Sequence, residues 1–197
     1  MIRDLQIAQP QSTRTRLKLC LAGEFAVGKT SLIRRFVHGD YDDRYIATWG
    51  THVTSKELDV FIGPDREKLP VLLNLWDIMG SRGLRELRRE TYFRGVQGIL
   101  AVCDATRPET LPALEGWRQT IFRVAGTVPT YILANKADQE RAISPEDLAK
   151  FCEEWGCPWL YTSARTGESV EEAFAGLTRL VLRFVAPTET SSRQKAY

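Results

Sequence analysis

The chain has 197 residues, a length typical of one domain with a single well-filled core. Hydrophobic residues make up 43% and charged residues 26%, and the formal net charge is +2. Such a small net charge gives no overall field that would attract nucleic acid or an anionic membrane. Because no run of about 18 apolar residues occurs and the N-terminus has no apolar secretion signal, we expect a cytoplasmic protein.

Four cysteines raise the question of a disulfide or a metal site. Cys20 and Cys103 lie in apolar runs, where a reduced cysteine packs as a small apolar side chain. Cys152 and Cys157 form a C-x4-C pair without a second pair of ligands nearby, which is poor spacing for zinc. We therefore expect reduced cysteines, with a disulfide or a metal at this pair as the minor alternative.

A polar stretch at residues 1–16, predicted to be a flexible arm, precedes alternating strands and helices. Short continuous apolar runs predict strands that are buried on both faces of a parallel sheet. An extra strand is expected over 51–62, joined to its neighbour by the turn GPDREK as an antiparallel hairpin. The predicted buried strands cover 17–22, 71–77, 98–104, 130–135 and 159–164.

Amphipathic segments predict helices over 29–37, 109–124, 144–156 and 169–185. The third has the clearest ends, with Ser144 as N-cap, Pro145 in the first turn and Gly156 after the last turn. This alternation predicts an α/β fold with three α/β/α layers and a mostly parallel six-stranded sheet. The polar residues 186–197 are expected to form a disordered tail.

The stretch GEFAVGKTS follows the first predicted strand and opens the first predicted helix. Its pattern G-x-x-x-x-G-K-[ST] in that setting predicts a phosphate-binding loop. Backbone N–H groups and the helix N-terminus attract phosphate, the lysine neutralises it, and the threonine hydroxyl can ligate Mg²⁺. The predicted loop residues are Gly23, Glu24, Phe25, Ala26, Val27, Gly28, Lys29, Thr30 and Ser31.

Two further motifs, NKAD and TSAR, follow strands at the edge of the sheet where open α/β folds bind ligands. The Asp138 carboxylate can accept hydrogen bonds from the two donors that guanine, unlike adenine, presents at N1 and N2. Asn135 and the stem of Lys136 can support the base and the loop. The Ala164 N–H, flanked by Ser163 and Arg165, can donate to guanine O6. The sequence therefore predicts a guanine nucleotide.

With these motifs in order, the chain resembles the small GTPases of the Ras superfamily, with a pattern most similar to the Rab-like branch. The resemblance rests on GEFAVGKT, YIATWG, WDIMG, NKAD and TSA, and it covers roughly residues 17–185, which would be one G domain. It implies a switch that binds GTP and GDP with Mg²⁺, and whose two mobile segments respond to the γ-phosphate.

The resemblance also implies roles for residues outside the three binding motifs. Tyr41 would lie against the base, and Thr48 would reach Mg²⁺ and the γ-phosphate. Asp77 would hold Mg²⁺ through water, and the Gly80 N–H would sense the γ-phosphate. With Thr30, this gives Thr30, Thr48 and Asp77 as the implied metal ligands, and Lys29, Thr48 and Gly80 as the implied catalytic set.

The chain departs from the family pattern at the position that orients the attacking water. Ser81 stands where the family has a glutamine, and a serine side chain is too short to hold the water in line. Phe25 and Ala26 occupy loop positions where small residues are usual. The Phe25 ring would lie over the phosphates, where it would block an arginine from a partner, or pack against the segment that follows Asp77. We expect slow GTP hydrolysis.

Partner contacts are expected through the switch regions. Val53, Trp76 and Tyr92 match apolar positions that Rab-like proteins present to partners, although core packing explains the last two equally well. Trp49 is a candidate interface anchor. The arginine-rich stretch after Asp77 would face an acidic partner or solvent. With no cysteine after Cys157, we expect no lipid anchor, so that membranes would be reached only through partners.

The function predicted from the sequence is a GTP/GDP switch with slow, Mg²⁺-dependent hydrolysis of GTP by water. The alternative is a non-hydrolysing scaffold that keeps one nucleotide and presents Trp49, Val53, Trp76 and Tyr92 to partners. Ser81 and Phe25 favour the scaffold, whereas Thr48, Asp77 and Gly80 favour a working switch.

Overall fold

The structure is a computed structural model that describes residues 15–42, 51–63, 67–78 and 89–185. A six-stranded sheet runs through its centre with the strand order β2-β3-β1-β4-β5-β6. All neighbouring strands are parallel except β2 and β3, which form an antiparallel pair. The strands are β1 (Thr15–Ala22), β2 (Thr51–Ile62), β3 (Glu67–Ile78), β4 (Gly98–Asp104), β5 (Thr130–Asn135) and β6 (Trp159–Thr162).

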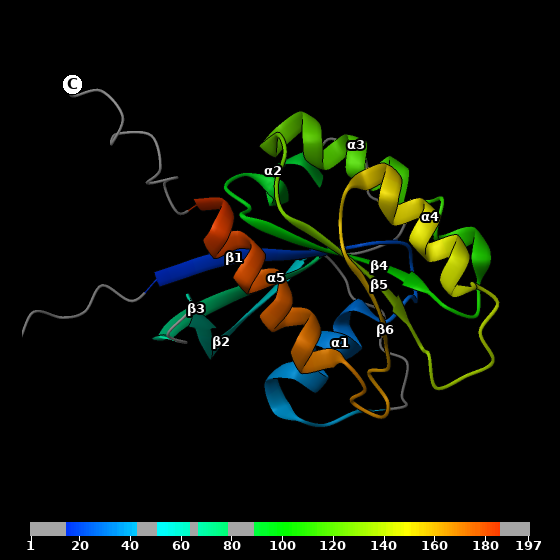
Figure 1. The fold of residues 1–197 in the computed structure, drawn as a ribbon, viewed down its shortest axis with the longest axis horizontal. Coiled ribbons are helices and arrows are strands. Elements are labelled where there is room, and N and C mark those ends of the chain that lie inside the picture. The colour runs from blue at the N-terminus through cyan, green and yellow to red at the C-terminus, as the bar shows by residue number, and fades with distance from the viewer. Residues whose placement is uncertain (1–14, 43–50, 64–66, 79–88, 186–197) are drawn as a thin grey trace, which may run out of the picture.

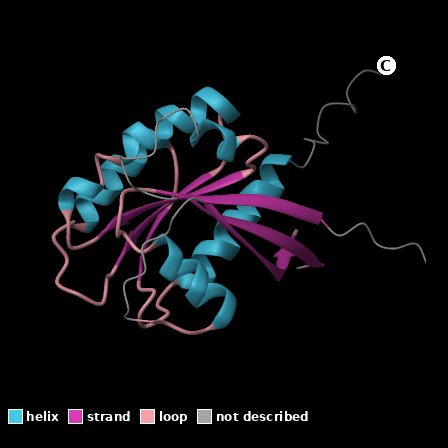
Figure 2. Ribbon diagram, turned by 180° about the vertical axis from the view of Figure 1, so that it is seen from behind, coloured by secondary structure: helices cyan, strands magenta, loops and turns pink. Residues whose placement is uncertain are grey.

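Helices cover both faces of the sheet, so the predicted three-layer fold is confirmed (Figures 1 and 2). On one face, α1 (Lys29–His38) and α5 (Val170–Val185) bury a core in which the rings of Phe36 and Phe174 stack at 3.9 Å. The other face is covered by α3 (Leu114–Ala125), α4 (Pro145–Trp155) and the short α2 (Arg89–Phe93). Among the helices that the structure describes, none combines the length and apolar character needed to cross a membrane.

Several element ends differ from the prediction. The strand β3 begins at Glu67 instead of residue 71, because its extra residues pair with the far end of β2 in the hairpin. The strand β1 takes in Thr15 and Arg16, which were predicted to belong to the arm. The helix predicted over 109–124 is wrong in its first turn. A 3-10 turn, η2 (Pro108–Thr110), comes first and α3 begins only at Leu114, because Pro112 has no N–H for a continuous helix.

The predicted ends of α4 are confirmed. The Ser144 hydroxyl accepts a hydrogen bond from the Asp147 N–H, and the Asp147 carboxylate accepts one from the Ser144 N–H, which makes a capping box. At the other end, Gly156 takes a left-handed conformation with φ of 62°. Local signals therefore set both ends of this helix.

Gly98 allows α5 to lie close against β4. A Cβ atom at this position would be 2.7 Å from a Val181 methyl carbon and 3.0 Å from a Leu19 methyl carbon, both of which are buried. We predict that Gly98→Ala lowers the free energy of unfolding by about 1–3 kcal/mol, because the core has no room for the methyl group. Urea unfolding at a fixed nucleotide concentration measures this change.

Gly116→Ala is the matched control, because Gly116 is an exposed residue of α3 whose Cβ would meet no atom within 4 Å. We expect this variant to gain about 0.5–1 kcal/mol through helix propensity. Equal effects of the two substitutions would contradict the proposed close packing of α5 on Gly98.

Candidate nucleotide-binding site

The predicted phosphate loop connects the end of β1 to the start of α1, at the carboxyl edge of the parallel strands. Two of its glycines have positive φ angles and lie close to other parts of the protein. A Cβ atom would come within 2.1 Å of the Val102 carbonyl oxygen at Gly23, and within 2.2 Å of Asn135 Nδ2 at Gly28. The loop therefore needs glycine at both positions, and its close approach to β4 and β5 shapes a backbone-lined cradle.

Ala26 also has a left-handed backbone, with φ of 60°. This conformation costs roughly 1–2 kcal/mol at a residue that has a side chain. Ala26, which stands where glycine is common, therefore adopts the left-handed turn of the loop at the cost of some backbone strain.

Lys29 lies at the first position of α1, with only 6% of the residue exposed. Its Nζ donates hydrogen bonds to the carbonyl oxygens of Gly23 and Glu24, each at 2.8 Å. The Lys29 side chain is thereby folded back over the loop, with its ammonium group near the positive end of the α1 dipole. This arrangement concentrates positive charge at the cradle.

Two of the three predicted metal ligands are brought together. The Thr30 hydroxyl of α1 donates to Asp77 Oδ2 at the end of β3, and Asp77 is only 2% exposed. Hydroxyl and carboxylate oxygens are the ligand types that Mg²⁺ prefers. Among the described residues, no group of three or more His, Cys, Asp or Glu side chains could hold a metal ion. The third predicted ligand, Thr48, lies outside the described residues.

Asn135, at the end of β5, connects the three predicted binding motifs. Its side-chain Nδ2 donates to the Val27 carbonyl oxygen of the phosphate loop at 2.9 Å. Its Oδ1 accepts hydrogen bonds from the Thr162 hydroxyl at 3.3 Å and from the Ala164 N–H at 3.2 Å. Asn135 is 1% exposed, so these bonds lie in the protein interior. The Ala164 N–H, predicted to face guanine, bonds to Asn135 in this structure.

The predicted base-reading carboxylate, Asp138, is also held in place by the TSAR segment. Ser163 Oγ donates to Asp138 Oδ1 at 2.6 Å, and an Arg165 guanidinium nitrogen lies 3.9 Å from Oδ2. Arg35 of α1 reaches the same segment and donates to the Ala164 carbonyl oxygen at 2.7 Å. The helix that follows the phosphate loop and the predicted base-binding segments are therefore directly bonded.

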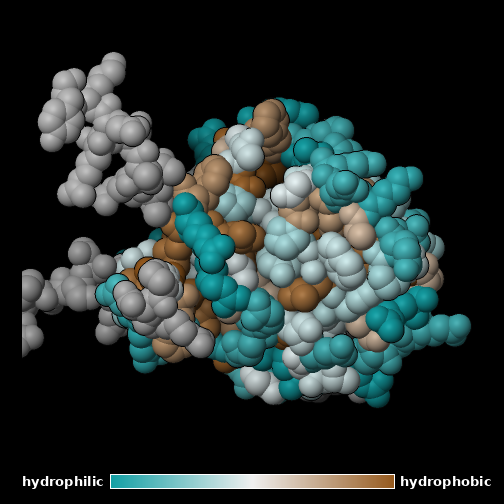
Figure 3. Space-filling view, in the orientation of Figure 1, coloured by the Kyte–Doolittle hydropathy of each residue, from teal (hydrophilic) through white to brown (hydrophobic). Residues whose placement is uncertain are grey.

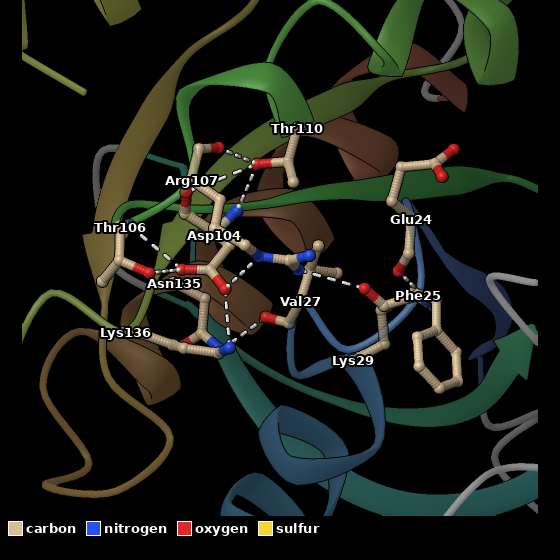
Figure 4. A network of polar contacts seen from close by, with 10 residues as sticks. All are labelled: Glu24, Phe25, Val27, Lys29, Asp104, Thr106, Arg107, Thr110, Asn135 and Lys136. Carbon is tan, nitrogen blue, oxygen red and sulfur yellow. Dashed lines mark hydrogen bonds and ion pairs between the residues drawn. The ribbon is translucent and has the colours of Figure 1, made fainter. Parts of the chain in front are cut away.

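A buried carboxylate, Asp104, organises a network that the sequence interpretation missed (Figure 4). Its Oδ2 accepts from Lys136 Nζ at 2.6 Å and from Arg107 Nε at 2.9 Å, and its Oδ1 accepts from Thr106. Arg107 also donates to the Phe25 carbonyl oxygen at 3.0 Å. Burial by itself would raise the pKa of Asp104, but the bonds from Lys136, Thr106 and Arg107 outweigh it and lower that pKa.

The strand pattern contained a signal for this network. Asp104 ends the strand next to β5 and pairs in register with Asn135, so its carboxylate had to lie beside NKAD. The network also revises the role of Lys136, whose ammonium group binds Asp104 while its backbone has a positive φ of 67°. Asp104 thus links the NKAD segment to the phosphate loop through Arg107.

The Phe25 ring is exposed, with 46% of the residue accessible to solvent. Figure 4 shows the ring turned away from the Asp104 network, to which the Phe25 carbonyl oxygen is bonded. On the preceding residue, Glu24 Oε1 accepts a hydrogen bond from Trp117 Nε1 of α3 at 3.3 Å. Packing of the ring against the segment after Asp77 was one predicted position, and that segment lies outside the described residues.

Three of the predicted partner residues, Val53, Trp76 and Tyr92, lie on β2, β3 and α2. Val53 and Trp76 face each other across β2 and β3, and Val53 is 46% exposed. Trp76 and Tyr92 are half-buried and pack against the core, and Lys18 Nζ lies 3.8 Å from the centre of a Trp76 ring. Tyr41 is 37% exposed. The predicted residues Thr48, Trp49, Gly80 and Ser81 lie outside the described residues.

Comparison with known proteins identifies the family. The model of the Ras family matches residues 18–183. The Dictyostelium discoideum Ras-related protein Rab-32C is 33% identical over 181 residues, which cover 89% of this chain and 78% of the relative. Dog Ras-related protein Rab-13 is 33% identical, covering 84% and 79%, and the maize GTP-binding protein YPTM1 is 31% identical, covering 90% and 84%. The chain therefore belongs to the Ras family of small GTP-binding proteins.

Proposed function

We propose that this chain is a molecular switch that binds GTP and GDP with Mg²⁺ and hydrolyses GTP slowly. The observation that carries the proposal is the buried Asn135 side chain, whose bonds join the phosphate loop to TSAR. Three segments that are far apart in sequence thus meet at one edge of the sheet, which is where open α/β folds bind nucleotides.

The phosphate groups would lie at the loop of residues 23–28 and at Lys29. The close contacts of Gly23 and Gly28 support this assignment, because a loop with side chains there could not keep the backbone cradle. Lys29 supplies positive charge at the start of α1, and a phosphate group near its Nζ would share that charge with the loop carbonyls. Thr30 and Asp77 supply oxygen ligands for Mg²⁺, with Thr48 and Gly80 completing the contacts to the metal and the γ-phosphate.

The base would be guanine, recognised by Asp138, with Ser163, Ala164, Arg165 and Tyr41 around it. The Ser163 hydroxyl fixes Asp138 at 2.6 Å, which leaves the carboxylate oriented for a pair of donors. Adenine has no such pair, so the contact selects guanine. Asn135 and Lys136 act as positioning residues, because both bind other protein groups.

Hydrolysis would use water as the nucleophile, and we propose that it is slow. The proposal rests on Ser81 standing where the family pattern has a glutamine, because a serine side chain is too short to hold an attacking water in line. The exposed Phe25 ring of the loop supports this proposal, because it would hinder the access of an accelerating partner. The scaffold function remains the second candidate, because Val53 and Trp76 already form a partly exposed apolar pair on β2 and β3.

The nucleotide content of the purified protein tests the function most directly. Chromatography of the denatured protein should release GTP or GDP in near-equal amount to the chain. A single-turnover assay of the Mg²⁺–GTP complex, with and without a cell extract, should then show slow formation of GDP. Absence of any guanine nucleotide would overturn the binding proposal, and absence of GDP in both assays would favour the scaffold.

Asp138→Asn tests the assignment of the base. An amide cannot accept both guanine donors, and bonds to a charged group are worth about 1.5–3 kcal/mol, so GDP affinity should fall roughly 10- to 100-fold. Affinity for xanthosine diphosphate should rise, because xanthine presents an oxygen where guanine has its amino group. Fluorescent-nucleotide titration measures both changes. Asp59→Asn on β2 is the control, and an equal loss there would contradict the assignment.

Ser81→Gln tests the proposed cause of slow hydrolysis. A longer amide that can orient water should raise the single-turnover rate roughly 10-fold or more without changing GTP affinity. Ser55→Gln, at an exposed position on β2, is the matched substitution and should leave the rate unchanged. If Ser81→Gln hydrolyses GTP no faster than Ser55→Gln, the serine at position 81 is not the cause of slow hydrolysis.

Asp104→Asn tests the link between NKAD and the phosphate loop. Removing the buried charge leaves Lys136 and Arg107 without their ion-pair partner, so the free energy of unfolding at pH 7 should fall by on the order of 3 kcal/mol. The pKa of Asp104 is lower in the folded protein than in the unfolded chain. The wild type's higher free energy of unfolding is therefore fully present above the unfolded carboxyl pKa of about 3.9. It is lost as the pH falls through the folded pKa.

Urea unfolding of wild type and Asp104→Asn from pH 7 to pH 3, at a fixed GDP and Mg²⁺ concentration, measures this dependence. The Asp59→Asn variant serves again as the control for loss of an exposed carboxylate. A difference between wild type and Asp104→Asn that stays constant over this range would contradict the role of the ionised Asp104.

A further inference from the structure

Two cysteines meet where α4 ends. The Cys157 N–H donates to the Cys152 carbonyl oxygen at 3.2 Å, and the Gly156 N–H donates to the Glu153 carbonyl oxygen at 3.1 Å. With left-handed Gly156 between them, these two bonds form a Schellman motif. In that motif the side chains at the positions of Cys152 and Cys157 commonly touch, so the turn itself brings the two thiols together.

The surroundings of the two thiols differ. Cys152 is 2% exposed and belongs to the core beneath α3 and α4, whereas Cys157 is partly exposed. Cys157 lines a pocket of about 490 Å³ that begins at the amino ends of β4 and β5, the opposite edge from the nucleotide site. One thiol is therefore accessible and the other is held behind it.

The pocket combines apolar walls with positive charge. Phe122 and Phe184 are each 62% exposed at its border, and apolar side chains are visible at the surface between α3 and α5 (Figure 3). Arg118 and Arg183 also line it, and the Arg118 guanidinium lies 5.0 Å from the ring centre of Trp155. Such a pocket suits a small molecule that carries carboxylates next to a less polar reactive group.

The electrostatics favour a thiolate at Cys157. A hydrogen bond from the Cys152 thiol lowers the pKa of Cys157, burial opposes this, and the charge of Arg118 lowers the pKa further. By contrast, burial raises the pKa of Cys20 and of Cys103 to about 12. The accessible cysteine of the pair is thus also the one with the greater tendency to ionise.

We propose that Cys157 and Cys152 form a redox site, in which Cys157 attacks small anionic disulfides and Cys152 completes the exchange. The Cys157 thiolate attacks one sulfur of the disulfide RSSR, forms a mixed disulfide and releases RS⁻. The Cys152 thiol then loses its proton and attacks Cys157 Sγ, which releases the second RS⁻. The chain loses two electrons and two protons, RSSR becomes two RSH, and a Cys152–Cys157 disulfide results.

Wild-type protein with bound Mg²⁺ and GDP, treated with glutathione disulfide, provides the test. Trypsin cuts after Lys150 and Arg165, so one peptide, residues 151–165, holds both cysteines of the pair. We expect this peptide to become two hydrogen atoms lighter, while Cys20 and Cys103 remain reduced. Oxidation of Cys20 or Cys103 at the same rate, or a glutathione adduct on Cys157 that never resolves, would overturn the proposal.

Two variants separate the roles of the cysteines. In Cys152→Ser the glutathione adduct should persist on Cys157, because no thiol is present to displace it. In Cys157→Ser, Cys152 should stay unmodified in the folded protein. Modification of Cys152 in Cys157→Ser would contradict the proposal that Cys157 is the attacking thiol. The wild-type peptide result stands by itself if either variant folds poorly.

The contribution of Arg118 is tested by the rate at which iodoacetate alkylates Cys157. Arg118→Gln should slow this rate roughly threefold or more, because the thiolate loses a nearby positive charge. Arg123→Gln, on the same helix but not lining the pocket, is the matched control and should react like wild type. Equal rates in the two variants would show that Arg118 does not activate Cys157.

Discussion

The candidate nucleotide site of this protein depends on one buried amide. Asn135, at the end of β5, donates to the phosphate loop after β1 and accepts from Thr162 and Ala164 at the end of β6, so its bonds join three strand–loop junctions. A buried donor or acceptor that loses its partner costs about 1–3 kcal/mol, so each segment holds the others at this edge of the sheet. The Asp104 network makes a second, charged connection between the same segments. Asp104 of β4 binds Lys136 of NKAD, and Arg107, which also binds Asp104, donates to the Phe25 carbonyl oxygen of the loop. Loop shape is thus maintained from outside the loop.

Much of the fold could be predicted because its signals are local. Buried apolar runs, the capping box at Ser144 and the glycines of the phosphate loop act within a few residues, and all correspond to observed features. The start of the helix predicted over 109–124 was wrong because apolar spacing was given more weight than Pro112. The Asp104 network was missed because its partners are distant in sequence, although the register of β4 and β5 implied it. A disulfide or a metal at Cys152 and Cys157 was only the minor alternative, because the C-x4-C spacing is poor for zinc, whereas a helix-ending turn brings such residues together.

The two edges of the sheet carry different chemistry. The carboxyl edge gathers backbone amides, Lys29 and the acidic side chains of Asp77 and Asp138, which suit a charged, metal-bound ligand. The amino edge has the apolar pocket with Cys157 and Arg118. The strands β4 and β5 span both edges and are almost fully buried, so the two sites share a rigid support without sharing residues.

The bond between Arg35 and Ala164 has a consequence for how the protein assembles. It joins residues 129 positions apart, and the Asn135–Val27 bond joins residues 108 apart. A chain in which only the amino-terminal half has folded contains the whole GKT motif but neither of these bonds. Closing such long loops is entropically unfavourable until the last strands dock. A ligand that needs both bonds would therefore bind only the complete domain, so that its binding free energy is added to the stability of the whole chain.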